Sequence, residues 1–369
     1  MVANKRKKFD RVLGIDLGNG LIKIRSVKPN GKDYSVILPS SFAYLKDVGD
    51  SVNNTSLQLD VFTIDDVDYV WGEDINQVGE VKSTYGHENR YKTEAYKLMA
   101  KMVLARAVRD LDIKPNENIL LVTGVPSAET GTEREEEIVA AFIGEGKQKG
   151  LLLVGVNGVE HIFKVVHVEV QAQALATVIG RYLATDGTVE NENYEHWKVA
   201  VIDIGAGTID LDIVHSLRRQ KGYHSVPKGF RDVYETIRTG IAKIYPSHTV
   251  NDYELLGILE ETQKKNALTG KNEVIYEYKP SHLRKSVDFT KDLHDGVKEV
   301  VVDVQQAIMS KWKNQTDLDE ILLVGGSAEL FKDHLNDIVY GITIPRNNGD
   351  SNVEGYFRFG MYLMESEDE

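Results

Sequence analysis

Short apolar runs, each ended by a turn, recur along the chain. Residues 12–15, 199–202 and 321–324 are such runs, and each has the length and composition of a buried β-strand that is followed at once by a turn. Residues 118–126 and 162–170 predict two more strands of the same kind. The pattern therefore predicts a series of buried strands that end at turns.

Between these strands, apolar residues follow helical spacing. In residues 93–108, the side chains of Leu98, Met102, Ala105 and Val108 fall on one helical face. Further helices are predicted at residues 171–183, 232–244, 253–263 and 289–311, with an acidic helix start at residues 133–137. Strand-first halves with interleaved helices predict an α/β protein that binds its ligand at the carboxyl ends of the strands.

Polar segments interrupt this pattern. Residues 46–60 predict an exposed insertion, and residues 185–196 predict a polar insert between a helix and a strand. Residues 28–31 carry the proline, asparagine and glycine of a tight hairpin. The basic start at residues 5–8 lacks the apolar face that a membrane anchor needs, so we interpret it as a solvated tail.

Composition narrows the class of protein. A length of 369 residues exceeds what one hydrophobic core usually supports, so we expect two domains. The formal net charge of −13 argues against direct binding to nucleic acid or to an anionic membrane, which needs clustered cations. No apolar run approaches the roughly 18 residues that span a bilayer. The chain contains no cysteine, which fits a reducing compartment, and we expect a cytoplasmic protein.

An acidic glycine-rich turn occurs twice, at residues 16–20 and 203–210, which lie about 187 residues apart. A third glycine-rich turn, Gly325-Gly326-Ser327, follows. Glycines there allow a positive φ and bring backbone N–H groups close to an anion. A carboxylate would repel phosphate unless a cation lay between them, so the pattern indicates Mg²⁺. Two such turns predict two halves that grip one nucleotide.

Three motifs, in this order and at these distances, resemble those of the actin, Hsp70 and sugar-kinase superfamily. Asp16-x-Gly-x-x-x-x-Lys23 is similar to its phosphate-1 motif, and Asp203-x-Gly-x-Gly-Thr-x-Asp210 to its phosphate-2 motif. Residues 324–328 resemble its adenosine motif. Three further segments resemble the bacterial actin-like proteins of plasmid segregation, the ParM or StbA group. They are residues 38–42, 122–127 and 352–356, the last together with Gly360.

The resemblance implies an actin-like, ribonuclease H-like α/β fold of two domains with a nucleotide cleft between them. Domain I is expected to comprise residues 1–169 with a C-terminal return at residues 345–369. Domain II is expected to comprise residues 170–344.

The resemblance also implies roles within the three motifs. Asp16 and Asp203 are expected to take part in catalysis and to face a Mg²⁺ ion, largely through water. Lys23 is expected to reach the β and γ phosphates as a compact cation. The expected phosphate donors are Gly18, Asn19, Gly20, Gly205, Ala206, Gly207 and Thr208. The residues expected to border the adenosine are Gly325, Gly326 and Ser327, with a further loop at Gly229-Phe230.

Hydrolysis needs a residue that positions the attacking water, because phosphoryl transfer depends chiefly on positioning and charge stabilisation. Relatives carry a Glu or Gln at the start of the helix that follows the strand at residues 162–170, and Gln171 matches that position. Glu169 and Gln173 are the alternatives, since each lies two residues away. The chain departs from the relatives at Val170, where they often have proline.

The resemblance implies a filament-forming ATPase that needs Mg²⁺ and uses ATP, with GTP as an alternative. Self-assembly would drive plasmid segregation through a ParR-like adaptor bound to centromere DNA, without direct contact between this chain and nucleic acid. The alternatives are a monomeric phosphotransferase like the sugar kinases, for which no separate sugar site is evident, and an actin homologue with a cell-shape role. The acidic end at residues 364–369 argues against membrane attachment.

Overall fold

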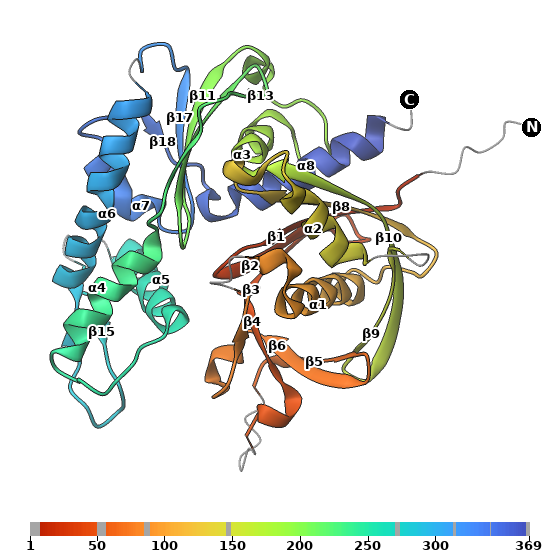
Figure 1. Ribbon diagram of the computed structural model, residues 1–369, viewed down its shortest axis with the longest axis horizontal. Helices are drawn as coiled ribbons and strands as arrows, with labels where there is room; N and C mark the ends of the chain where they lie inside the picture. The colour runs from red at the N-terminus through yellow and green to blue at the C-terminus, as the bar shows by residue number, and fades with distance from the viewer. Residues whose placement is uncertain are drawn as a thin grey trace, which may run out of the picture. The chain divides into compact units, whose positions relative to one another are not determined.

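The structure, a computed structural model, forms two compact units. Unit 1 comprises Met1–Val199, Asp212–Lys221 and Asp350–Glu369, and unit 2 comprises Ala200–Leu211 and Gly222–Gly349. Each unit contains both strands and helices (Figure 1). The residues described are 8–49, 57–84, 89–144, 149–269, 274–312, 315–339 and 341–366.

A ten-stranded sheet forms the centre of unit 1, in the order β3-β2-β1-β8-β10-β9-β5-β6-β4-β7. Its strands are β1 (Arg11–Leu17), β2 (Leu21–Val27), β3 (Asp33–Pro39), β4 (Ser41–Tyr44), β5 (Leu59–Ile64), β6 (Val67–Gly72), β7 (Lys82–Ser83), β8 (Asn118–Val125), β9 (Leu151–Val156) and β10 (Val159–Ala172). β1 is antiparallel to β2 and parallel to β8, which is parallel to β10. The carboxyl ends of β1, β8 and β10 therefore meet at one edge of the sheet.

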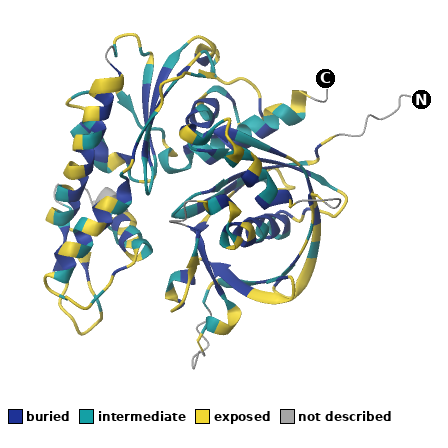
Figure 2. Cartoon of the chain, viewed as in Figure 1, coloured by how far each residue is buried: buried dark blue, intermediate teal, exposed yellow. Residues whose placement is uncertain are grey.

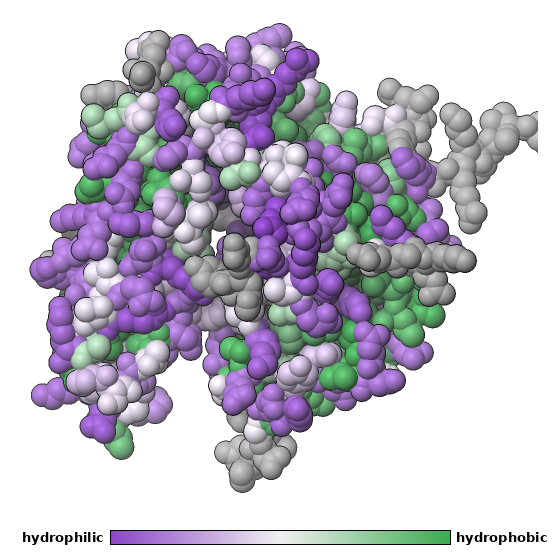
Figure 3. Space-filling model, in the orientation of Figure 1, coloured by the Kyte–Doolittle hydropathy of each residue, from purple (hydrophilic) through white to green (hydrophobic). Residues whose placement is uncertain are grey.

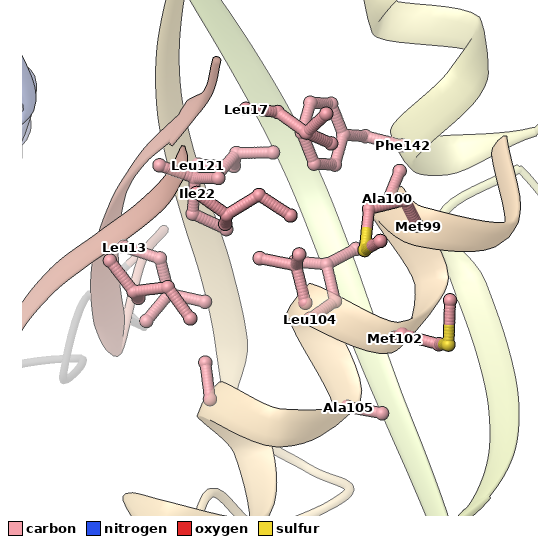
Figure 4. Packing of buried hydrophobic residues seen from close by; sticks show 14 of the residues in the cluster. Leu13, Leu17, Ile22, Met99, Ala100, Met102, Leu104, Ala105, Leu121 and Phe142 are labelled. Atoms are coloured by element: carbon pink, nitrogen blue, oxygen red, sulfur yellow. The ribbon is translucent and has the colours of Figure 1, made fainter. Parts of the chain in front are cut away.

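Helices cover both faces of this sheet, because alternate residues of its strands point to opposite sides. Leu13 and Leu17 of β1 pack in one core with Met99 of α1 and Phe142 of α2 (Figure 4). Val12 belongs to a second core, on the other face, with α3 and α8. The helices of unit 1 are α1 (Glu94–Asp110), α2 (Glu133–Ile143), α3 (Gln173–Tyr182) and α8 (Ser351–Ser366), with short 3-10 turns η1 (Leu45–Asp47), η2 (Ile75–Gln77), η3 (Arg90–Lys92), η4 (Ser127–Glu129) and η5 (Glu192–Glu195).

The helix predicted at residues 93–108 is confirmed as α1, which Figure 2 shows to be mostly buried. Thr93 caps it, since its side chain accepts a hydrogen bond from the Tyr96 N–H at 3.3 Å. The four apolar residues that predict its inner face are all buried: Leu98, Met102, Ala105 and Val108.

Unit 2 is organised around a second sheet, in the order β13-β12-β11-β17-β18, with β14 paired to β12. The strands of this sheet are β11 (Lys198–Ile204), β12 (Ile209–His215), β13 (Arg218–Arg219), β14 (His224–Val226), β17 (Glu320–Val324) and β18 (Ile342–Thr343), beside a separate pair, β15 (Glu277–Tyr278) and β16 (Val287–Asp288). By their contacts, residues 198–199 of β11, residues 212–215 of β12 and the whole of β13 belong to unit 1. α4 packs on α6, and α6 packs on α7. The helices are α4 (Phe230–Ala242), α5 (Asp252–Thr269), α6 (Thr290–Lys311) and α7 (Ala328–Leu335), followed by the 3-10 turn η6 (Asn348–Asp350).

The two sheets share one strand order. The first has β3-β2-β1-β8-β10 at one end, and the second has β13-β12-β11-β17-β18. In the first sheet β1 lies between its hairpin partner β2 and β8, and in the second sheet β11 lies between its hairpin partner β12 and β17. The acidic glycine-rich turns connect β1 to β2 and β11 to β12, so they hold equivalent places. The α/β fold class is confirmed.

The structure corrects one boundary. β10 continues to Ala172 and α3 begins at Gln173, so Gln171 lies in a strand and not in the first turn of a helix. Contacts also group α3 with unit 1, because it packs on α8. The division into residues 1–169 and 170–344 places α3 in the second domain; it describes domains by resemblance and not by contacts, and it stays a prediction.

Part of the predicted insertions lies outside the described residues. Of residues 46–60, the structure describes residues 46–49 and 57–60, and β5 begins at Leu59. Residues 5–7 of the basic start also lie outside the description. The polar insert at residues 185–196 is anchored by Tyr194, which is buried and receives a hydrogen bond from Arg181 Nε at 3.2 Å.

The face of the molecule drawn in Figure 3 is mostly hydrophilic. Exposed apolar side chains do occur on the β9–β10 hairpin, at Leu151, Leu153 and Ile162. None of the helices in the described part of the chain combines the length and the hydropathy needed to cross a membrane.

Two helices of unit 1 approach each other through glycine. A Cβ atom on Gly355 of α8 would lie 1.8 Å from the Ala176 carbonyl oxygen of α3. One on Gly180 of α3 would lie 3.2 Å from the Gly355 nitrogen. Thr177 Oγ1 also donates to Asn352 Oδ1 at 2.6 Å across this contact. The glycine at position 355 is therefore required by close packing of α3 on α8.

We expect Gly355→Ala to lower the free energy of unfolding by about 1–3 kcal/mol, because the added methyl group forces the two helix backbones apart. Denaturant unfolding checks this. Gly257→Ala in α5 is the matched control, since a Cβ there meets no atom within 4 Å, and alanine in place of glycine inside a helix stabilises by about 0.5–1 kcal/mol. Equal stabilities for the two variants would contradict the packing argument.

Candidate functional site

The first acidic turn is the tip of the β1–β2 hairpin. Asp16 lies directly opposite Lys23 in the register of these strands, and Lys23 Nζ is 3.8 Å from Asp16 Oδ2. The spacing between the two residues in the motif therefore follows from the hairpin, which sets a cation beside the carboxylate. A Cβ on Gly18 would lie 2.6 Å from the Leu21 carbonyl oxygen, so the turn has no room for a side chain there.

The Asp16 carboxylate is held in a poorly solvated place, with only 14% of its side chain exposed. Burial raises the pKa of Asp16 above its ordinary value, Lys23 and Arg90 offset this only in part, and the charge of Asp350 adds to it. A divalent cation nearby would favour the ionised form. A carboxylate oxygen is also the kind of ligand that Mg²⁺ prefers, so this residue fits the predicted metal.

Arg90, in η3, is a component of this turn that the motifs do not indicate. Its Nη2 atom donates to the Leu17 carbonyl oxygen at 2.6 Å, and its Nη1 atom donates to Asn19 Oδ1. The contacts join residues more than 70 positions apart in the chain. No local pattern marks such a residue, which explains why motif spacing misses it.

Gln171 lies at the carboxyl end of β10, opposite Gly124 of β8. Its side chain is buried, with the residue 8% exposed, and its Oε1 atom accepts no hydrogen bond from the described residues. A buried amide oxygen without a donor carries a cost of about 1–3 kcal/mol, which a bound water would relieve. The position suits a residue that holds a water molecule.

The two alternatives to Gln171 differ from it in surroundings. Glu169 is partly exposed, and its Oε2 atom is 3.3 Å from His167 Nε2. Gln173 is the first residue of α3 and is partly exposed. Only Gln171 combines burial with an open acceptor atom, so the geometry favours it, and its role stays a prediction.

The second acidic turn is the tip of the β11–β12 hairpin in unit 2. Asp203 is partly buried near the end of β11. The Gly205 N–H donates to the Thr208 carbonyl oxygen at 2.9 Å, which closes the turn. Thr208 Oγ1 donates to Asp210 Oδ2 at 3.1 Å, so the last aspartate of the motif fixes the threonine.

The start of α4 holds this turn by its carbonyl groups. The Phe230 N–H donates to the Gly205 oxygen and the Arg231 N–H donates to the Ala206 oxygen, both at 3.0 Å. Gly229 makes the approach possible, because a Cβ there would lie 2.6 Å from Ala206 backbone atoms. The structure thus places the Gly229-Phe230 loop, which is expected near the adenosine, against the second acidic turn.

This attachment fixes the direction of two N–H groups. A trans peptide holds its carbonyl and its N–H on opposite sides, and none of the described peptides is cis. Since α4 binds the carbonyls of Gly205 and Ala206, the N–H groups of Ala206 and Gly207 in the same two peptides point away from α4. Both belong to the donors predicted for the phosphates.

The third glycine-rich turn lies against the end of β11. Gly325 has a φ of 107°, and a Cβ on it would lie 2.3 Å from the Ile204 carbonyl oxygen. Its N–H donates to the Asn348 oxygen at 3.0 Å. A Cβ on Gly326 meets no atom within 4 Å, so open space borders that residue. Ser327 precedes α7 as its N-terminal flanking residue.

Glycine is required at positions 18, 205 and 325 of these turns mainly because a side chain would not fit. A positive φ applies to Gly325, whereas Gly18 and Gly205 have φ values outside the left-handed region. For the two acidic turns the expectation of a positive φ at these glycines is therefore wrong. At Gly205 a Cβ would lie 2.8 Å from the Thr208 carbonyl oxygen, which makes close backbone approach the reason for glycine.

Two family models match the chain. "Actin like proteins N terminal domain" matches residues 14–175, and "Archaeal actin homologue MreB-like, C-terminal" matches residues 201–337. The three glycine-rich turns all fall inside these matches. Comparison with curated proteins gives no match.

Solved structures share the fold over nearly the whole chain. Apo psk41 ParM is 19% identical with a TM-score of 0.70, covering 97% of this chain and 99% of its own. Bacillus thuringiensis ParM with ATP is 15% identical with a TM-score of 0.68, covering 98% and 100%. The Alp12 filament structure is 18% identical with a TM-score of 0.61, covering 97% and 99%. At these identities the likeness shows the two-domain actin-like fold.

We expect Gly229→Ala to weaken Mg-ATP binding at least about tenfold, roughly 1.4 kcal/mol, because its methyl group displaces the backbone that orients the Ala206 and Gly207 N–H groups. Calorimetric titration measures this. Gly257→Ala in α5 is the matched control, since it adds the same methyl group in unit 2 at a place where a Cβ meets no atom within 4 Å. Unaltered binding by a folded Gly229→Ala protein would contradict the role given to α4.

Proposed function

The chain belongs to the actin-like proteins, and from this premise we propose that it is an ATPase that polymerises with nucleotide and drives the segregation of plasmids. Each subunit binds Mg-ATP through its two acidic turns and hydrolyses it after assembly. A ParR-like adaptor, bound to centromere DNA, links the filament to the plasmid, so this chain has no direct contact with nucleic acid. The filament works in the cytoplasm.

One observation carries the proposal. Both sheets have the same strand order, and each places an acidic glycine-rich hairpin after its first strand. A single such hairpin is a common turn. Two at equivalent places, with a third glycine-rich turn after β17, supply backbone donors and carboxylates suited to a magnesium-bound triphosphate.

The charged residues of the turns have two roles, to hold the metal ion and to neutralise phosphate charge. Asp16 and Asp203 hold the Mg²⁺ ion, largely through water, and Lys23 neutralises phosphate charge beside Asp16. The ion, when bound, neutralises the phosphate oxygens. The raised pKa of Asp16 supports this assignment. Burial penalises the charged form of the carboxylate, and the positive charges of Lys23 and Arg90 offset that penalty only in part.

Gln171 positions the attacking water. A neutral amide has negligible basicity, so its part is to orient the water and not to remove its proton. The open Oε1 atom can accept a hydrogen bond from the water, and burial restricts the directions from which water can approach. A phosphotransferase that acts on a hydroxyl group needs a carboxylate there, so the amide favours hydrolysis over the sugar-kinase alternative.

The solved relatives support the two parts of the proposal separately. The Bacillus thuringiensis ParM was solved with ATP, and Alp12 was solved as a filament. Nucleotide binding and self-assembly therefore both occur on this fold.

We expect the purified chain to assemble when ATP and Mg²⁺ are both present and not when EDTA removes the ion, because the carboxylates then repel the phosphates. Light scattering and negative-stain microscopy with ATP, ADP, GTP or no nucleotide measure this. Equal assembly in EDTA without nucleotide would refute the switch. Consumption of ATP with a second substrate and without polymer would instead favour a kinase.

We expect the Asp203→Ala variant, measured in the same assembly experiments, to lose Mg-ATP binding and assembly together. Asp333→Ala, which removes an exposed carboxylate of α7 in unit 2, is the matched control. Thermal unfolding without nucleotide separates loss of ligand from loss of fold.

We expect Gln171→Ala to keep nucleotide and to polymerise, but to hydrolyse ATP on the order of 10²-fold more slowly, since the water is no longer oriented. Its filaments should then persist longer. Phosphate release and filament disassembly are the measurements. Gln173→Ala removes the same amide two residues away, and Glu169→Ala removes the other alternative. A normal rate for Gln171→Ala with a slow rate for either of these would move the assignment.

A further inference from the structure

We propose that Arg90 is a positioning residue for the first glycine-rich turn, which it holds in the conformation that offers the Gly18 N–H and the Asn19 amide group to phosphate. The inference rests on the proposed binding of nucleotide. Arg90 lies in η3, which precedes α1, outside every motif that indicates the site.

The guanidinium group bridges two acceptors of the turn. Nη2 donates to the Leu17 carbonyl oxygen at 2.6 Å, and Nη1 donates to Asn19 Oδ1. Arginine suits this task, because its planar fork presents two parallel donors. Lysine has a single charged nitrogen that cannot span the two acceptors in the same way.

The bridge decides which groups remain for a ligand. The carbonyl of Leu17 and the N–H of Gly18 belong to one trans peptide, so the bond to Arg90 turns that N–H to the opposite side. In the Asn19 side chain, the oxygen faces Arg90, which leaves the amide NH₂ on the other side as a donor. An acceptor that would repel phosphate is thus satisfied by Arg90, and two donors face away from it.

The guanidinium is held in place by its own surroundings. Its carbon lies 5.4 Å from the centre of the Tyr91 ring and 5.2 Å from that of Tyr96, within the range of cation–π contact. The Arg90 carbonyl accepts a hydrogen bond from Thr93 Oγ1 at 2.7 Å. The aromatic contacts hold the guanidinium and the Thr93 bond holds the backbone of Arg90, so the residue keeps the position from which it binds the turn.

The test compares Mg-ATP affinity, by calorimetric titration, among Arg90→Ala, Arg90→Lys, Asn19→Ala and the double variant Arg90→Ala/Asn19→Ala. Lys92→Ala is the matched control, since it removes a cation from the same 3-10 turn, where Lys92 pairs with Glu137. Each protein is also unfolded thermally without nucleotide.

We expect Arg90→Ala to bind Mg-ATP at least about tenfold more weakly, with Arg90→Lys nearly as weak and Lys92→Ala unchanged. The double variant should bind no more weakly than Arg90→Ala alone, because Asn19 acts through the arrangement that Arg90 sets. A purely structural residue would lower the unfolding temperature without this coupling.

Three results would overturn the inference. They are unchanged affinity in Arg90→Ala, full affinity in Arg90→Lys, which would indicate a simple charge effect, and losses that multiply in the double variant. If Arg90→Ala does not fold, Arg90→Lys and Asn19→Ala with their double variant decide by the same rule. Failure of the unaltered chain to bind Mg-ATP would instead refute the proposed function.

Discussion

A peptide group cannot turn its carbonyl and its N–H to the same side, and both acidic turns depend on this constraint. An anion is bound by N–H groups only if the carbonyls of those peptides are satisfied elsewhere. In unit 2 the Phe230 and Arg231 N–H groups at the start of α4 donate hydrogen bonds to these carbonyls. In unit 1 the Arg90 side chain takes the Leu17 carbonyl. One physical requirement is therefore met by a helix end in one half and by a guanidinium in the other.

Close approach of backbone to backbone follows from the same requirement. Gly229 lets α4 reach the phosphate-2 turn, Gly325 brings the third turn against β11, and Gly18 allows the tight end of β1–β2. A Cβ at any of these places would lie within 3.0 Å of a backbone carbonyl, so a side chain there would force the two backbones apart. The glycines of the motifs thus record contacts between elements as well as room for a ligand.

How far the sequence predicts the molecule depends on the range of the interaction. α1 and the strands before each turn are predicted because their patterns repeat within a few residues. Gln171 is placed in the wrong element, because β10 is extended to Ala172 by pairing with β8, and that partner is distant in the chain. Arg90 and Asn348 escape motif analysis for the same reason, since each acts on a turn remote in sequence.

α8 also sets an order of events during synthesis. Phe357 and Tyr356 complete a core whose other members include Val12 and Leu120, so β1 and β8 need α8 to complete their packing. Loop closure over such a span is slow, and contacts of high sequence separation form late in folding. Unit 2 lies wholly between these segments and emerges before α8. The inserted half can therefore fold before α8 has been made, while Val12 of β1 and Leu120 of β8 still lack the side chains of α8 that cover them.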